Sequence, residues 1–198
     1  MSSPILPSGF IKTAYKLAGR DAGQGRPALS DLRRSTSTAY YALYHQILRH
    51  GVFAAVPNAS EDDVANITRW FTHTGVADAA AWVVTAASNK QQLNKSERGP
   101  VLLLRRDPRQ PIQDELLLVA ETFIDLQRAR HEADYSSSYD PVRYATVDHV
   151  NSAQAALKAT ESMWRAQESS RTERQELANS YKRFLILCLS ASGGPKTR

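Results

Sequence analysis

Apolar residues recur at helical spacing along nearly the whole chain, and no alternating run of apolar and polar residues indicates a strand. Near the N-terminus, for example, Phe10, Ala14 and Leu17 are three or four positions apart, which places them on one face of a helix. The pattern predicts an all-α fold, an up-and-down helical bundle of six to seven helices. Because 198 residues suffice for one fair-sized domain or at most two small ones, we expect a single helical domain over 1–190 and a disordered tail over 191–198.

Residues that begin or end helices set the expected boundaries. The first helix is expected to start at Ser8 and to end in the Gly-rich segment 21–25. Ser30 or Asp31 is expected to cap a second helix that ends at Gly51. Further helices are predicted over about 61–73, 76–93, 111–136, 146–167 and 171–190, with a loop over 94–110 that includes a short extended piece at 101–104.

The composition excludes several classes of protein. The single cysteine, Cys188, allows no intrachain disulfide and no Cys-based zinc site, and the five histidines show no metal-binding spacing. The first residues lack the basic start and apolar run of a signal peptide, and no apolar stretch approaches the roughly 18 residues that span a bilayer. We therefore expect a soluble cytoplasmic protein with no metal, no cofactor and no membrane partner.

The formal net charge of +5 is spread over three basic segments, 1–34, 90–110 and 168–198. Residues 60–78 and 111–135 are acidic. A mild basic excess of this kind permits contact with phosphates, but an ordinary solvated surface would have the same charge.

A polar stripe is predicted on the second helix. Arg34, Ser37, Tyr41 and His45 follow one another at spacings of three or four residues, so they share one helix face. They are candidates for a ligand-binding or structural polar seam. The alternative is a core histidine beside a hydrogen-bonded tyrosine, since buried polar groups generally find partners.

A second polar cluster lies at the end of the long helix predicted over 111–136. Arg130 and Asp134, and likewise His131 and Tyr135, are four residues apart and so lie along one helix edge. The simplest alternative is an Arg–Asp pair that fixes the helix end. We expect the 33–45 and 126–135 segments to pack together, with Arg34, Tyr41 or His45 near Asp134 or Tyr135, because one shared polar seam explains both stripes.

Together the two clusters resemble the HEPN family of small helical-bundle proteins. RRSTSTAYYALYH (33–45) is similar to the family pattern RR-x-x-S-x-x-YYA-x-[FY]-H, and RHEADY (130–135) is similar to R-x-x-A-D-Y. The resemblance covers about 8–165 and implies a core of four or five helices that dimerises face to face. A homodimer is also expected because the long helix is apolar on more than one face. The resemblance further implies bacterial defence or a toxin–antitoxin system, with a cognate antitoxin or defence protein as partner.

Catalytic HEPN members resemble metal-independent ribonucleases that use Arg-x(4–6)-His at the dimer cleft. A histidine near neutral pKa can move the 2′-hydroxyl proton, and an arginine can hold the scissile phosphate. Asp134 stands where those members carry the histidine. The candidate catalytic residues are therefore Arg130 with its neighbour His131, or the Arg-x5-His pair Arg143 and His149.

Three hypotheses for the function follow. The first is a HEPN-like module that associates with RNA or a nucleotide and dimerises, with little or no catalysis. The alternative is a metal-independent endoribonuclease with an Arg/His pair at a dimer cleft. The third is a purely structural helical scaffold whose polar stripes are buried in intramolecular pairs.

Overall fold

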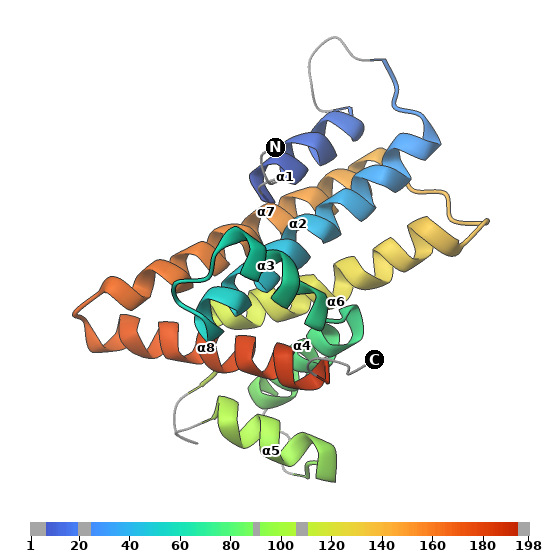
Figure 1. The fold of residues 1–198 in the computed structure, drawn as a ribbon. Helices are drawn as coiled ribbons and strands as arrows, with labels where there is room; N and C mark the ends of the chain where they lie inside the picture. The colour runs from blue at the N-terminus through green and yellow to red at the C-terminus, as the bar shows by residue number, and fades with distance from the viewer. Residues whose placement is uncertain (1–6, 20–24, 89–91, 106–110, 194–198) are drawn as a thin grey trace. The chain divides into compact units, whose positions relative to one another are not determined.

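The all-α fold is confirmed by the structure, a computed structural model that describes residues 7–19, 25–88, 92–105 and 111–193 (Figure 1). These ranges contain eight α-helices and two short 3₁₀-helices, η1 and η2, but no strand. None of the helices in the described ranges has the length and apolarity needed to cross a bilayer. The elements are α1 (Pro7–Leu17), α2 (Leu29–Ala55), α3 (Glu61–Ile67), η1 (Thr68–Trp70), α4 (His73–Ala87), α5 (Lys95–Leu104), α6 (Asp114–Tyr135), α7 (Arg143–Arg165), η2 (Ala166–Glu168) and α8 (Thr172–Ala191).

The chain forms two compact units. The first unit comprises residues 1–46 and 122–158, and the second comprises residues 47–121 and 159–198. The boundaries fall inside α2, α6 and α7. The expectation of a single domain over 1–190 stays a prediction.

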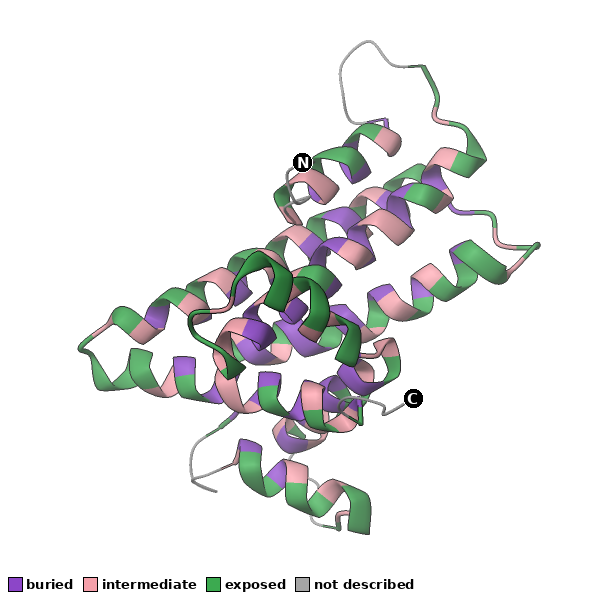
Figure 2. Ribbon diagram, viewed as in Figure 1, coloured by how far each residue is buried: buried purple, intermediate pink, exposed green. Residues whose placement is uncertain are grey.

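In the first unit, α1 packs against both α2 and α7 (Figure 1). The buried Ser35 hydroxyl donates to the Ala14 carbonyl at 2.8 Å, and the Tyr15 hydroxyl donates to Asn151 Oδ1 at 2.7 Å. Tyr40 is fully buried, and its ring centroid lies 5.4 Å from that of Phe123 on α6. Buried residues line the inward faces of these helices, as the periodicity requires (Figure 2).

In the second unit, α4 and α8 approach closely at Gly75. A Cβ atom at this position would lie 2.6 Å from the backbone nitrogen of Ser192, so only glycine permits the contact. Ser192 Oγ also accepts a hydrogen bond of 2.9 Å from the Thr72 backbone N–H. The start of α4 is thus held against the end of α8.

A buried histidine lies elsewhere in the second unit. His50 Nδ1 is 3.0 Å from the Tyr181 hydroxyl, and the His50 ring stacks on Trp164 with a centroid distance of 4.6 Å. Burial, with a smaller contribution from Arg49, lowers the pKa of His50 to about 4. The imidazole is therefore neutral at physiological pH, and it packs as part of the core.

The predicted boundaries of α2 are wrong at both ends. The helix begins at Leu29, so Ser30 and Asp31 lie inside its first turn, which the Ala28 carbonyl closes by accepting from the Leu32 N–H at 3.2 Å. At the other end the helix continues through Gly51 to Ala55. A Cβ atom at Gly51 would lie 2.6 Å from Phe71 Cζ, so this glycine makes room for a ring instead of ending the helix.

The loop predicted over 94–110 is also wrong where the structure describes it. Residues 95–104 form α5, so the extended piece expected at 101–104 is helical. Asn94 and Glu97 form a capping box, with the Asn94 backbone N–H donating to Glu97 Oε2 at 2.7 Å. This cap, together with the burial of Val101 and Leu104, outweighs the helix-breaking effect of Pro100. Residues 106–110 lie outside the described part.

The remaining boundaries shift by a few residues. The helix predicted over 61–73 ends at Ile67 and is followed by η1, while the helix predicted over 76–93 begins at His73 and ends at Ala87. Thr72 caps that helix through a 3.0 Å bond from the Gly75 N–H to its side-chain oxygen. Of the predicted tail, residues 194–198 lie outside the described part.

Gly51→Ala should destabilise the protein. The added methyl group would overlap the buried Phe71 ring, and overpacking of this kind costs about 1–3 kcal/mol. Urea unfolding followed by circular dichroism measures the change. The double variant Gly51→Ala, Phe71→Leu should lose less than the sum of the two single variants. A Gly51→Ala protein as stable as the parent would contradict this interpretation of the glycine.

Candidate functional site

The predicted packing of the 33–45 and 126–135 segments is confirmed. Both segments are helical, and Ser37 Oγ on α2 donates to Asp134 Oδ1 on α6 at 2.5 Å. Arg130 Nη2 donates to the Tyr41 hydroxyl at 3.0 Å. Arg34 and His45, the other two candidates from the stripe, are exposed and take no part in these two bonds.

Arg130 is the centre of this seam. Its Nε lies 2.7 Å from Asp134 Oδ2, and its side chain is only 17% exposed. The guanidinium carbon lies 5.7 Å from the ring centroid of Tyr40, 5.4 Å from that of Tyr41 and 5.7 Å from that of Tyr135. The charge of Arg130 is therefore stabilised both by cation–π contacts and by an ion pair. In this arrangement Arg130 joins the end of α6 to the middle of α2.

Exposed aromatic rings lie beside the seam. His131 and Tyr135 have a centroid distance of 5.1 Å, and Tyr135 is 68% exposed. His45 is also exposed, and it stacks on Tyr41 at 6.0 Å and on Phe10 at 5.4 Å. The surface around Arg130 thus carries open π-faces next to a guanidinium group.

The structure does not bring Arg143 and His149 together as a pair. Arg143 begins α7, and its guanidinium donates to the Ala18 carbonyl at 3.1 Å and to the Gly19 carbonyl at 2.5 Å. These carbonyls lie just after α1, where helix ends leave acceptors without intrahelical donors. His149 is six positions further along α7, which places it on a different face.

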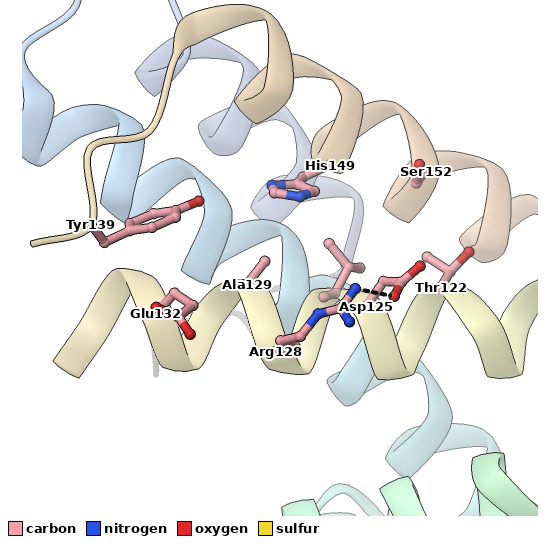
Figure 3. Close-up of a pocket in the computed structure, with 9 residues that line it drawn as sticks. Thr122, Asp125, Arg128, Ala129, Glu132, Tyr139, His149 and Ser152 are labelled. Carbon is pink, nitrogen blue, oxygen red and sulfur yellow. Dashed lines mark hydrogen bonds and ion pairs between the residues drawn. The ribbon is translucent and has the colours of Figure 1, made fainter. Parts of the chain in front are cut away.

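His149 faces a cleft between α6 and α7 in the first unit (Figure 3). The cleft has a volume of about 380 Å³, within the range of small-molecule sites. Its lining combines apolar side chains with hydroxyl, carboxylate, guanidinium and imidazole groups. The lining residues are Thr122, Asp125, Leu126, Arg128, Ala129, Glu132, Tyr139, His149 and Ser152.

The electrostatics of the cleft keep His149 neutral. Its Nδ1 is buried and has no hydrogen-bond partner among the described residues. Burial lowers the pKa of His149, and the nearby carboxylates of Asp125 and Asp148 only partly oppose that effect. Arg128 Nη2 pairs with Asp125 Oδ1 at 2.8 Å (Figure 3). A neutral imidazole of this kind can accept a proton.

Arg33 holds one wall of the cleft in place. Its Nε donates to the Tyr139 carbonyl at 3.2 Å, and its Nη2 donates to the same carbonyl at 2.8 Å and to the Ser136 carbonyl. These bonds fix the loop between α6 and α7, from which Tyr139 lines the cleft. The first arginine of the sequence motif therefore has a structural role.

Sequence reasoning missed Arg128 and Tyr139 as cleft residues. The available signal was the helical spacing of Asp125, Arg128 and Glu132, three and four residues apart on one face of α6. That spacing does not reveal which residues of α7 stand opposite. Only the pairing of the two helices adds His149.

The described residues contain no group of three or more His, Cys, Asp and Glu side chains that could hold a metal ion. Cys188 is buried, and burial raises the pKa of its thiol well above the ordinary value. A protonated buried thiol is a poor nucleophile.

Comparison with protein-family models, with curated proteins and with solved structures finds no match to this chain. The resemblance to the HEPN family therefore stays a prediction that rests on the two motifs.

Arg130→Ala should destabilise the protein far more than Arg128→Ala. Both arginines lie on α6 and pair with an aspartate, but the Arg130 side chain is 17% exposed and the Arg128 side chain is 75% exposed. Loss of Arg130 removes the cation that pairs with Asp134 and the donor to the Tyr41 hydroxyl, and should cost about 2–3 kcal/mol. Loss of the exposed pair should cost less than about 0.5 kcal/mol.

Denaturant unfolding of the two variants measures this difference. Helix propensity affects both equally, because each replaces arginine with alanine on the same helix. Equal losses would show that the seam does not stabilise the first unit.

Proposed function

We propose that this protein is a HEPN-like module that binds single-stranded RNA or a nucleotide at the aromatic surface beside Arg130 and does not cleave it. The observation that carries the proposal is the open ring pair of His131 and Tyr135 next to the Arg130 guanidinium. Exposed aromatic rings interleaved with cations are typical of surfaces on which nucleobases stack. The net charge of +5 permits a polyanionic ligand, although residues 111–135, which include this surface, are themselves acidic.

Asp134 is the reason why we expect no cleavage. In the catalytic HEPN pattern a histidine would stand there and act beside the arginine. Here the residue is a carboxylate that pairs with Arg130 at 2.7 Å and accepts from Ser37 at 2.5 Å. A carboxylate that neutralises the arginine weakens its hold on a scissile phosphate. Homodimerisation, an antitoxin or defence partner and a cytoplasmic location belong to the same proposal.

Tyr135→Ala should weaken binding of a fluorescent single-stranded RNA about tenfold, since a base that stacks on an aromatic ring gains about 1–3 kcal/mol. Tyr144→Ala is the matched control, because Tyr144 is 74% exposed on α7 and lies outside the seam and the cleft. Fluorescence anisotropy at constant salt measures both affinities.

The proposal predicts unchanged binding for Tyr144→Ala. Equal weakening in both variants would contradict stacking at Tyr135. Failure of the parent protein to bind RNA or a nucleotide would favour a helical scaffold instead.

A second candidate function is a metal-independent endoribonuclease centred on the cleft. It is favoured by the buried, unpartnered Nδ1 of His149, with Arg128 lining the same cleft. In this hypothesis His149 takes the 2′-hydroxyl proton and Arg128 holds the phosphate, while Glu132 and Asp125 make the cleft less favourable to an anion. That negative charge is why cleavage ranks second.

If the protein cleaves RNA, cleavage should persist in EDTA and His149→Ala should reduce the rate by about 10²-fold or more. His73→Ala is the control, because His73 begins α4 in the second unit and does not line the cleft. A gel assay with purified protein measures each variant. Cleavage abolished by EDTA, or by His131→Ala but not by His149→Ala, would contradict this candidate.

A further inference from the structure

A groove in the second unit lies between α5 and α8 and shares no residue with the proposed function. Its volume is about 570 Å³. Six residues line it: Leu102 and Leu103 from α5, and Asn179, Lys182, Arg183 and Ile186 from α8. The α8 residues recur three and four positions apart, so one face of that helix forms a wall of the groove.

The groove presents unusually exposed aliphatic side chains. Leu102 is 66% exposed, Leu103 is 43% exposed and Ile186 is 58% exposed. Single exposed aliphatic residues are common, but three that line one groove form an apolar surface that a ligand can cover.

Cationic groups lie beside this apolar surface. Arg183 is only 12% exposed at its side chain, and its Nη2 donates to Glu176 Oε1 at 2.6 Å and to Ser180 Oγ at 2.8 Å. Its Nε is buried and has no acceptor among the described residues. A buried N–H group without an acceptor is unfavourable, so Arg183, whose charge is paired with Glu176, retains one unused donor beside the groove. Lys182 adds a second positive charge to the lining.

We propose that this groove binds an aliphatic carboxylate. The hydrocarbon tail covers Leu102, Leu103 and Ile186, while the carboxylate pairs with the Lys182 charge and accepts a hydrogen bond from the unused Nε–H of Arg183. A carboxylate accepts from an arginine and a lysine at once, which a neutral alcohol does only weakly. An aliphatic amine is disfavoured because Glu176, the carboxylate nearest to Arg183, is already paired. This inference is independent of RNA binding.

Octanoate is the probe, added to the full-length protein and followed by nuclear magnetic resonance or calorimetric titration. Acetate carries the charge without the tail, and octylamine carries the same tail with the opposite charge. Octanoate should bind saturably, whereas acetate and octylamine should bind at least fivefold more weakly. Leu102→Ser should weaken octanoate binding without unfolding the protein, because Leu102 is largely exposed.

Lys182→Met keeps the aliphatic stem of the side chain and removes its charge, so it should weaken octanoate binding about fivefold. Lys95→Met is the matched control, because Lys95 is an exposed lysine of α5 that does not line the groove. Three results would overturn the proposal: no saturation with octanoate, equal binding of octylamine, or equal effects of the two lysine variants. Binding of a Leu/Glu-rich peptide but not of octanoate would assign the groove to a protein partner and would overturn it as well.

Discussion

The packing of α2 against α6 in the first unit depends on the contacts of the Arg130 guanidinium. This group lies within ion-pair distance of Asp134, bonds the Tyr41 hydroxyl and contacts the rings of three tyrosines. A partly buried cation needs a counter-charge and hydrogen-bond partners. Because Arg130 finds these partners on both α2 and α6, its contacts favour one alignment of the two helices. The hydrogen bond from Ser37 Oγ to Asp134 Oδ1 completes the seam. The residues that make the two sequence motifs recognisable are thus first of all residues that hold two helices together.

Two arginines on α6 illustrate how a shift of two residues changes the role of a charge. Arg130 points into the seam, whereas Arg128, about 200° away around the helix, lines the cleft with His149. The first charge is neutralised by Asp134 and enclosed by tyrosines, and the second is largely exposed. Structural and ligand-facing chemistry are therefore separated on opposite faces of one helix, and this separation is why binding and cleavage involve different residues in the two candidate functions.

The wrong predictions at Gly51 and Pro100 have a related physical cause. In an isolated helix glycine and proline favour a helix end or a kink, but in this chain other contacts override that tendency. Gly51 remains helical because Phe71 occupies the space of its missing side chain. Pro100 lies inside α5 because a capping box and two buried side chains compensate for the lost hydrogen bond. The Asn94–Glu97 capping box is a local signal in the sequence, whereas the Phe71 ring beside Gly51 and the burial of Val101 and Leu104 are decided outside any local window.

The sequence by itself determined the helical class and the two segments that pack together, but not which side chains bond across them, since Ser37 and not Arg34 bonds Asp134. Apolar periodicity fixes which faces are buried, and polar residues at spacings of three and four must share a helix edge. The tertiary structure decided what lies opposite each edge. His149 lines a cleft with Arg128 and not with Arg143. The Arg143 guanidinium instead donates to the Ala18 carbonyl just after α1. The pairing of the helices sets these contacts. Spacing along one helix carries no information about the register of another, so the cleft and the groove exist only in the folded chain.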